Sequence, residues 1–180
     1  MTQRHAVIPN LTQVVKPCEE VGTYQKSYTD FYENNDDADA KRQVSSAHVS
    51  DLYYNLVTDF FEYGWGCGFH FCPMRVGESF EHAQGKYQYR LALKLALKKG
   101  VKCLDVGCGV GGPGRNIASL SGATIYGINI NKYQLERCRF HAKFHELEDI
   151  CKYIEGDFHD MPIPDNSFDA ALSVESTCHS

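Results

Sequence analysis

The sequence predicts an α/β fold, in which a doubly wound, Rossmann-like parallel sheet follows an α-helical amino-terminal region. From about residue 100 onward, short apolar segments alternate with segments of helical periodicity, which is typical of parallel strands joined by helices. The first apolar segment leads directly into a glycine-rich turn at residues 107–112. A chain of 180 residues with 43% hydrophobic content is long enough for one ordinary domain with a core.

The first half of the chain divides into a polar part and a helical, aromatic part. Residues 1–48 are mixed and include an acid-rich stretch (ENNDDADAK), which predicts a solvated amino-terminal arm. Residues 49–61 and 78–99 have helical patterns, and Gly100 is expected to cap the second helix. Between them, residues 62–71 (EYGWGCGFHF) hold three glycines and four aromatics, so regular structure is not expected there. The stripe of the first helix consists of Leu52, Leu56, Val57, Phe60 and Phe61.

Residues 100–180 supply the expected α/β elements. Residues 101–106 predict the first strand, and Pro113 and Gly122 mark the beginning and the end of the next helix. After a second strand at residues 123–128, Asn131 and Gln134 resemble a capping box for a helix that ends near residue 147. A third strand precedes Asp157, and the turn at residues 165–167 leads into a fourth strand at residues 168–174.

Composition argues against several classes of protein. The formal charge is -5 and no basic run stands out, so nucleic acid is not an expected partner. The eight cysteines are scattered and lack paired CxxC spacing, so neither a disulfide framework nor a metal site is expected. No apolar run approaches the roughly 20 residues of a membrane span. Residues 1–10 lack a signal-peptide core, and the chain is therefore expected to be intracellular.

Polar residues recur at or near the ends of the predicted strands: Asp105, Asn129, Asp157 and Glu175. In an open parallel sheet, ligands bind in the crevice at the carboxyl ends of the strands. A carboxylate is costly at such a place unless something there uses its charge. The repetition of polar residues in register therefore predicts a ligand site.

Gly107, Gly109 and Gly111 lie in the predicted turn and would let the main chain approach a ligand closely. Gly107, Gly109 and Gly112 also satisfy the dinucleotide fingerprint, so a nicotinamide dehydrogenase is one alternative. Asp105 argues against it, because its carboxylate would crowd a pyrophosphate but could hold a cationic amino acid group. A purely structural turn is the other alternative.

The remaining strand-end residues predict how a nucleoside would be held. Asn129 could accept hydrogen bonds from ribose hydroxyls, although it is also a common turn residue. Asp157 could accept the amino group of adenine while Phe158 packs on the ring. The alternative for Asp157 is a loop cap after the strand.

The segments LDVGCGVGG, GIN and GDFHDMPIPDNSFDAA together resemble the class I S-adenosylmethionine-dependent methyltransferases. The longer set YYNLVTDFFEYGWGCGFHF, GCGVGGPGR, INKYQLERC and ESTCH is similar to the sterol 24-C-methyltransferase family, in the order of that family. The resemblance implies an S-adenosylmethionine-binding α/β domain at residues 100–180 and a sterol-binding region at residues 49–99. It also implies that the sheet is incomplete after its fourth strand. The 180 residues alone are then expected to bind cofactor weakly and to turn over little.

Methyl transfer to a sterol alkene leaves a carbocation, which aromatic faces stabilise by roughly 0.5–2 kcal/mol each. Tyr63, Trp65, Phe69 and Phe71 are the candidate rings, and core packing is their alternative role. The carbocation must then lose a proton. Glu175 is the first candidate for the base, with His70 and Glu62 as further bases or as ligands of the polar end of the sterol. All three match family positions, as does His179, for which no role is assigned.

Some positions depart from the family pattern. Phe61 stands where a tyrosine is usual, and Cys67 with Gly68 replaces a polar pair, so the methylated carbon could differ. A methyltransferase for another sterol position or another lipid therefore stays open, as does a truncated, non-catalytic ligand-binding protein. The expected partner is a sterol. Peripheral contact with a membrane, in particular the endoplasmic reticulum, and a homo-oligomer are further expectations.

Overall fold

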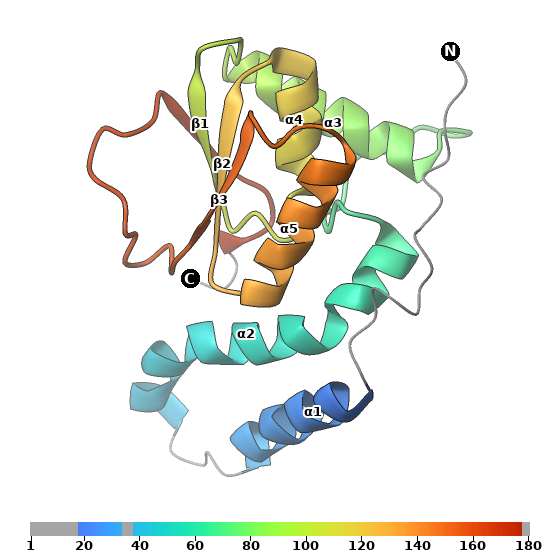
Figure 1. Ribbon diagram of the computed structural model, residues 1–180. Helices are drawn as coiled ribbons and strands as arrows, with labels where there is room; N and C mark the ends of the chain where they lie inside the picture. Colours follow the sequence, from blue (N-terminus) through green and yellow to red (C-terminus); the bar gives the residue numbers. More distant parts are fainter. Residues whose placement is uncertain (1–17, 34–37, 178–180) are drawn as a thin grey trace.

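The computed structural model describes residues 18–33 and 38–177 (Figure 1). Four parallel strands form one sheet in the order β3-β2-β1-β4. Three helices precede the sheet, and two lie between its first three strands. The elements are α1 (Cys18–Glu33), α2 (Ala38–Trp65), α3 (Phe80–Lys94), β1 (Lys102–Val106), α4 (Gly112–Ser121), β2 (Thr124–Asn129), α5 (Lys132–Phe144), β3 (Cys151–Glu155) and β4 (Ala170–Ser173).

The order of the strands follows from their connections. Each of the pairs β1–β2 and β2–β3 is joined by one helix, the usual crossover between parallel neighbours. The chain then returns past β1, where β4 pairs in parallel with the free edge of that strand. The core is built from small and branched side chains of the sheet and helices: Ala92, Cys103, Ile117, Ala118, Ala123, Ile125, Ala142, Cys151 and Leu172.

The predicted end of α4 and the predicted cap of α5 are confirmed, although Gln134 does not return a bond to the backbone N–H of Asn131, which donates to Asn129 instead. Gly122 closes α4 in the left-handed conformation, with a φ of 69°. Asn131 caps α5, because its side chain accepts the backbone N–H of Gln134 at 2.8 Å. Helix α5 ends at Phe144, a few residues before the expected position.

The prediction that Gly100 caps the second amino-terminal helix was wrong. Helix α3 ends at Lys94, and Ala96 follows with a positive φ of 51°. The backbone N–H of Leu97 then bonds to the carbonyl of Ala92 at 3.0 Å, which is the hydrogen bond of a Schellman ending. This ending turns Leu97 back against the core, and the gain in burial explains the early stop.

Helix α2 extends further than the sequence predicted in both directions. It includes residues 62–65, where the glycine content argued for irregular structure. Glu62 stabilises this last turn through an ion pair with Arg137 of α5. The expected apolar stripe is also wrong at Phe60, which is 69% exposed, whereas Leu52, Asn55 and Thr58 are buried. Helix α1 occupies part of the segment that was expected to be a solvated arm.

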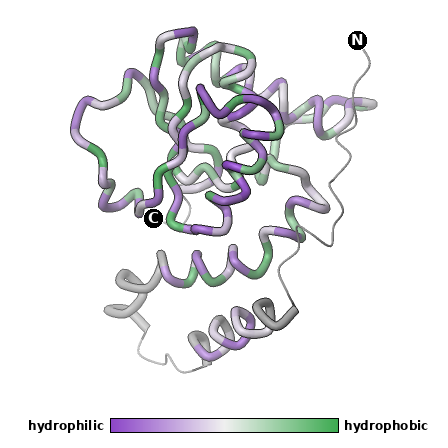
Figure 2. The backbone as a smooth tube through the Cα atoms, in the orientation of Figure 1, coloured by the Kyte–Doolittle hydropathy of each residue, from purple (hydrophilic) through white to green (hydrophobic). Residues whose placement is uncertain are grey.

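Helix α2 runs across the lower end of the α/β part and α1 lies beside it (Figure 1). Hydrophobic and hydrophilic residues alternate along the coloured part of α2 (Figure 2). Within the described ranges, no helix is both long and apolar enough to cross a membrane.

Candidate functional site

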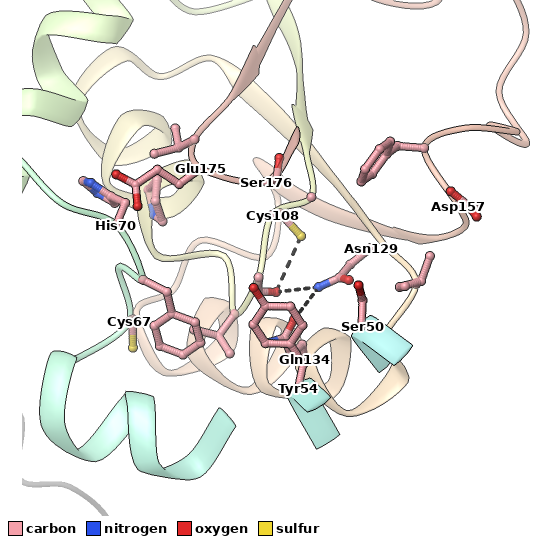
Figure 3. Close-up of a pocket in the computed structure, with 18 of the residues that line it drawn as sticks. Ser50, Tyr54, Cys67, His70, Cys108, Asn129, Gln134, Asp157, Glu175 and Ser176 are labelled. Carbon is pink, nitrogen blue, oxygen red and sulfur yellow. Dashed lines mark hydrogen bonds between the residues drawn. The ribbon is translucent and has the colours of Figure 1, made fainter. Parts of the chain in front are cut away.

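A pocket opens at the carboxyl ends of the parallel strands, the place where open α/β sheets bind ligands. Its walls come from α2, from the segment after α2, and from the segments that follow each of the four strands. Figure 3 shows His70 and Glu175 on one side of the pocket and Asp157 on the other, with Asn129 between them.

The glycine-rich turn after β1 has a backbone that other residues rarely adopt. Gly107, Gly109 and Gly111 have φ angles of 68°, 55° and 74°. A Cβ atom on Gly107 would lie 2.4 Å from the Cβ atom of Ser176, because the segment after β4 packs directly on the turn. Gly107 and Gly109 line the pocket, while Gly111 caps the beginning of α4. Two of the three predicted glycines are therefore placed to contact a ligand.

A buried arginine supports the same turn from behind. Arg115 is 4% exposed, and its Nη1 donates to the carbonyl oxygen of Val110. A Cβ atom on Gly111 would stand 3.0 Å from that nitrogen and 3.1 Å from the Tyr153 hydroxyl. A side chain at residue 111 would need these neighbours to shift by a few tenths of an ångström, and it would also be strained by the positive φ.

Asp105 lies behind the turn and is not part of the pocket wall. It is 3% exposed, and its Oδ2 lies 2.9 Å from the place of a Cβ atom on Gly114, in the first turn of α4. Burial raises the pKa of this carboxyl to about 7, against the opposing charge of Arg115. The structure thus separates Asp105 from Asn129 and Asp157, which do line the pocket.

Asn129 connects the pocket wall to two helices. Its Nδ2 donates to the carbonyl of Gly109 at 3.2 Å and to Oε1 of Gln134 at 2.8 Å. Its Oδ1 accepts the backbone N–H of Asn131 at 3.1 Å. Gln134 in turn donates to the hydroxyl of Thr58 in α2 at 3.0 Å. This network holds the glycine turn, α5 and α2 in a fixed arrangement around one side of the pocket.

Asp157 and Phe158 follow β3 and line the pocket together. Oδ1 of Asp157 accepts the backbone N–H of His159 at 2.9 Å and lies 2.8 Å from Nδ1 of the same residue. The backbone hydrogen bond, with that of the His159 side chain, lowers the pKa of Asp157. The loop cap that the sequence offered as the alternative is therefore present, at a residue that also faces the pocket.

Glu175 contacts the strap that joins α2 to α3, residues 66–79, and His70 is part of this strap. Oε1 of Glu175 accepts the backbone N–H of Phe71 at 3.0 Å. The ring of His70 is 2% exposed, with Nδ1 2.8 Å from the carbonyl oxygen of Phe71 and Nε2 2.8 Å from Nε2 of Gln88. Both ring nitrogens of His70 thus have a partner within the fold, whereas Glu175 is exposed and lines the pocket.

The other predicted catalytic residues lie at the end of α2 and outside the pocket. Burial by itself would raise the pKa of Glu62, but the hydrogen bonds from His141 and Arg137 hold this pKa below its usual value. Tyr63 is 70% exposed, and Trp65 packs edge-on against Phe71 and Phe80. Among the four candidate rings, the pocket wall includes Phe69, whose centroid lies 5.3 Å from that of Phe61.

Several pocket residues were missed by the sequence. Ser50 and Tyr54 come from α2, four residues apart and hence on one helix face. Ser176 follows Glu175, and its hydroxyl donates to the carbonyl of Val106 at 2.6 Å. Their spacing gave a weak signal at best, because the sequence does not state which face of α2 turns toward the sheet.

The sequence matches a family model described as a methyltransferase domain over residues 104–180. It is 46% identical over 158 residues to a sterol 24-C-methyltransferase of Gibberella zeae, covering 84% of this chain and 42% of that protein. The enzyme of the same description from Yarrowia lipolytica is 47% identical over 145 residues, covering 80% of this chain and 38% of that protein. The chain therefore spans about two fifths of the length of these relatives.

Solved structures agree on the fold. The cyclase SpnF superposes with a TM-score of 0.65 at 29% identity, covering 69% of this chain and 48% of that one. A protein from Galdieria sulphuraria, described as a sarcosine dimethylglycine methyltransferase, gives a TM-score of 0.59 at 24% identity. The superposition covers 67% of this chain and 48% of the Galdieria chain. Over the part that it spans, the chain belongs to the sterol 24-C-methyltransferase family of the class I S-adenosylmethionine-dependent methyltransferases.

Proposed function

We propose that this chain forms the cofactor site and one wall of the substrate site of an enzyme that C-methylates the side-chain alkene of a sterol. Residues 100–180 would bind S-adenosylmethionine, and residues 49–99 would contact the sterol. One observation carries the proposal: the glycine turn, Asn129 and Asp157 line the same pocket as Glu175 and Phe69. The residues that would hold a nucleoside therefore line the same pocket as Glu175, the candidate for the catalytic base.

The residues present fit S-adenosylmethionine. Gly107 and Gly109 expose main chain to the pocket, so an amino acid moiety can approach the backbone without meeting a side chain. Asp157 and Phe158 offer a hydrogen-bond acceptor and a ring for adenine. Asp105 would act from behind the turn, as the buried support of the first turn of α4. Asn129 would fix the wall near the ribose through its bond to Gly109.

Bound S-adenosylmethionine supplies a methyl group on a sulfonium, and its transfer to an alkene carbon leaves a positive charge on the sterol. Phe69 lines the pocket and would stabilise that charge with its ring. Glu175 would accept the proton that the sterol then loses, which restores a neutral alkene. The Phe71 N–H orients the carboxylate for this role. His70 would act through the strap that it holds, because both of its ring nitrogens are already partnered.

We also propose peripheral contact with a membrane, the endoplasmic reticulum in particular, and assembly as a homo-oligomer. Support comes from apolar side chains that are exposed around the end of α2 and the strap, among them Phe60, Tyr63, Phe71, Met74 and Val76. Co-sedimentation with vesicles tests the first, and light scattering of the purified chain tests the second.

Calorimetry with S-adenosylhomocysteine tests the cofactor site. The chain should bind this ligand, and Asp157→Asn should weaken binding by about 1.5–3 kcal/mol, because a charged acceptor is lost. Asp165→Asn is the matched control, since Asp165 is an exposed carboxylate of the same connection outside the pocket wall. Absence of binding, or equal effects of the two substitutions, would contradict the proposal.

Transfer of a labelled methyl group tests the substrate, with a panel of sterols and fatty acyl lipids as acceptors. The assay compares the 180-residue chain with a form extended through the further strands of the family fold. Label is expected in side-chain-unsaturated sterols, and Glu175→Gln should lower turnover by about 100-fold or more. Glu155→Gln, at an exposed carboxylate outside the pocket wall, should not. Label in acyl lipids alone would refute the sterol assignment.

A further inference from the structure

Three side chains that are candidate metal ligands converge at the edge of the pocket, which only Cys67 among them lines. They are Glu62 from the last full turn of α2, Cys67 from the strap, and His141 from α5. The Sγ atom of Cys67 lies 3.6 Å from Nε2 of His141 and 3.8 Å from Oε1 of Glu62. Nε2 of His141 lies 2.5 Å from the same Oε1. One ligand atom from each residue therefore points into a common space.

These separations are close to those of a tetrahedral zinc site. Bonds of about 2.3 Å to sulfur and about 2.0–2.2 Å to nitrogen and oxygen place neighbouring ligand atoms roughly 3.4–3.6 Å apart. The two distances from Cys67 already lie near this range. The third, between His141 and Glu62, is a direct hydrogen bond and would open by about 1 Å as the ion takes its place.

Arg137 occupies the position of an outer-shell partner. Its Nε donates to Oε2 of Glu62 at 2.6 Å, while its Nη2 donates to Oε1 of Glu62 at 3.3 Å and lies 3.3 Å from Nε2 of His141. The Nε bond is made to the oxygen that would not bind the ion, as is typical of metal-bound carboxylates, and Nη2 would move away from the two ligand atoms as the ion enters. The side chains of Arg137, Glu62 and His141 are 12%, 11% and 14% exposed, so the group is shielded and yet within reach of an ion from solvent.

We propose that Glu62, Cys67 and His141 bind one Zn²⁺ ion, with Arg137 holding the carboxylate and a water molecule completing the coordination. The mixed sulfur, nitrogen and oxygen donor set favours zinc over a hard ion such as Mg²⁺. Cys67 binds as the thiolate, and its proton leaves to solvent.

The ion would join the strap to α5 beside the cofactor turn. Cys67 lines the pocket, and a Cβ atom on Gly112 would lie only 1.9 Å from its carbonyl oxygen. The main chain at residue 67 is therefore packed against the first residue of α4. Zinc binding at this residue would fix that contact, and it would stabilise the folded state over the unfolded one.

Titration of the metal-free chain with Zn²⁺, followed by calorimetry, tests the site. One ion per chain is expected, together with a rise in the melting temperature, and Mg²⁺ should produce neither. Cys67→Ser and His141→Gln should abolish both effects, while Arg137→Gln should weaken binding by roughly tenfold or more. Cys72→Ser and His82→Gln are the controls and should bind as the natural chain does, since neither residue belongs to the cluster.

Co²⁺ in place of Zn²⁺ gives a second readout, because a thiolate ligand produces a sulfur-to-metal charge-transfer band. Cys67→Ser should remove that band, with circular dichroism showing that this nearly isosteric variant is folded. Failure of the natural chain to bind Zn²⁺, or binding that persists in Cys67→Ser and His141→Gln, would overturn the proposal. Neither readout depends on methyl transfer, so these experiments test the zinc site independently of the proposed function.

Discussion

Nε2 of Gln88 lies 2.8 Å from Nε2 of His70, and this pair connects α3 to the strap over the pocket. On the other side, Oε1 of Gln88 accepts Nδ2 of Asn116 at 2.7 Å. Because Gln88 accepts from Asn116, its Nε2 is free to donate to His70, whose Nδ1–H then donates to the carbonyl of Phe71. Phe71 in turn donates its backbone N–H to the carboxylate of Glu175. A chain of hydrogen bonds thus runs from α4 to the proposed base.

Gln88→Leu should lower the free energy of unfolding by about 1–3 kcal/mol, because it leaves the buried ring of His70 without its partner on α3. Urea denaturation measures the change. Arg90→Ala, at an exposed position of the same helix, should cost less than about 0.5 kcal/mol. Equal losses for both variants would mean that the chain of hydrogen bonds contributes little.

Gly107→Ala should abolish binding of S-adenosylhomocysteine and destabilise the fold. The added methyl group would meet Ser176 at 2.4 Å, and the φ of 68° is strained for alanine. Gly85→Ala is the matched control, because a Cβ atom there meets nothing within 4 Å inside helix α3. It should raise the free energy of unfolding by about 0.5–1 kcal/mol. Calorimetry and urea denaturation read out the two effects, and a Gly107→Ala chain that binds ligand normally would contradict this account.

Asp105 should make stability fall as the pH rises from about 4 to 7. The folded state raises the pKa of its carboxyl from 3.8 to about 7, so in this window the folded chain keeps a proton that the unfolded chain has lost. The free energy of unfolding then falls by at most about 1.4 kcal/mol per pH unit from this residue. In Asp105→Asn the contribution is absent.

The difference in unfolding free energy between Asp105→Asn and the natural chain should therefore grow in favour of the variant from pH 4.5 to pH 7.5. Urea denaturation at several pH values measures it. The comparison cancels the titration of other carboxylates, which acts in both proteins. A difference that does not change with pH would show that the ionisation of Asp105 is not linked to folding.

Asn131 has two roles that substitution can separate. It caps α5, and its Nδ2 donates to Oδ1 of Asp51 in α2 at 2.8 Å. Asn131→Ala removes both and should cost about 2 kcal/mol or more of unfolding free energy. Asn131→Asp keeps a good cap but replaces the donor to Asp51 with a like charge, so it should cost about 1–2 kcal/mol. If Asn131→Asp matched the natural chain in urea denaturation, the contact with α2 would be unimportant.

The local elements of the α/β part could be read from the sequence because each depends on neighbours in the chain. Gly122 closes α4 and Asn131 caps α5 through bonds that span four residues or fewer. Helix α2 could not be bounded in this way. Its last turn forms despite Gly64 because Glu62 pairs with Arg137, a partner 75 residues away.

The candidate site shows the same division. The sequence alone determined the alternation of strands and helices, the glycine turn, and the family, since these are properties of consecutive residues. Only the tertiary structure decided which side chains face the pocket: it turned Asp105 behind the glycine turn and left Tyr63 exposed. It also brought Cys67 within 3.6 Å of His141, where sequence spacing had argued against any metal site. The direction of a side chain depends on how whole helices and strands pack, and that packing is fixed by burial and pairing between residues far apart in the chain.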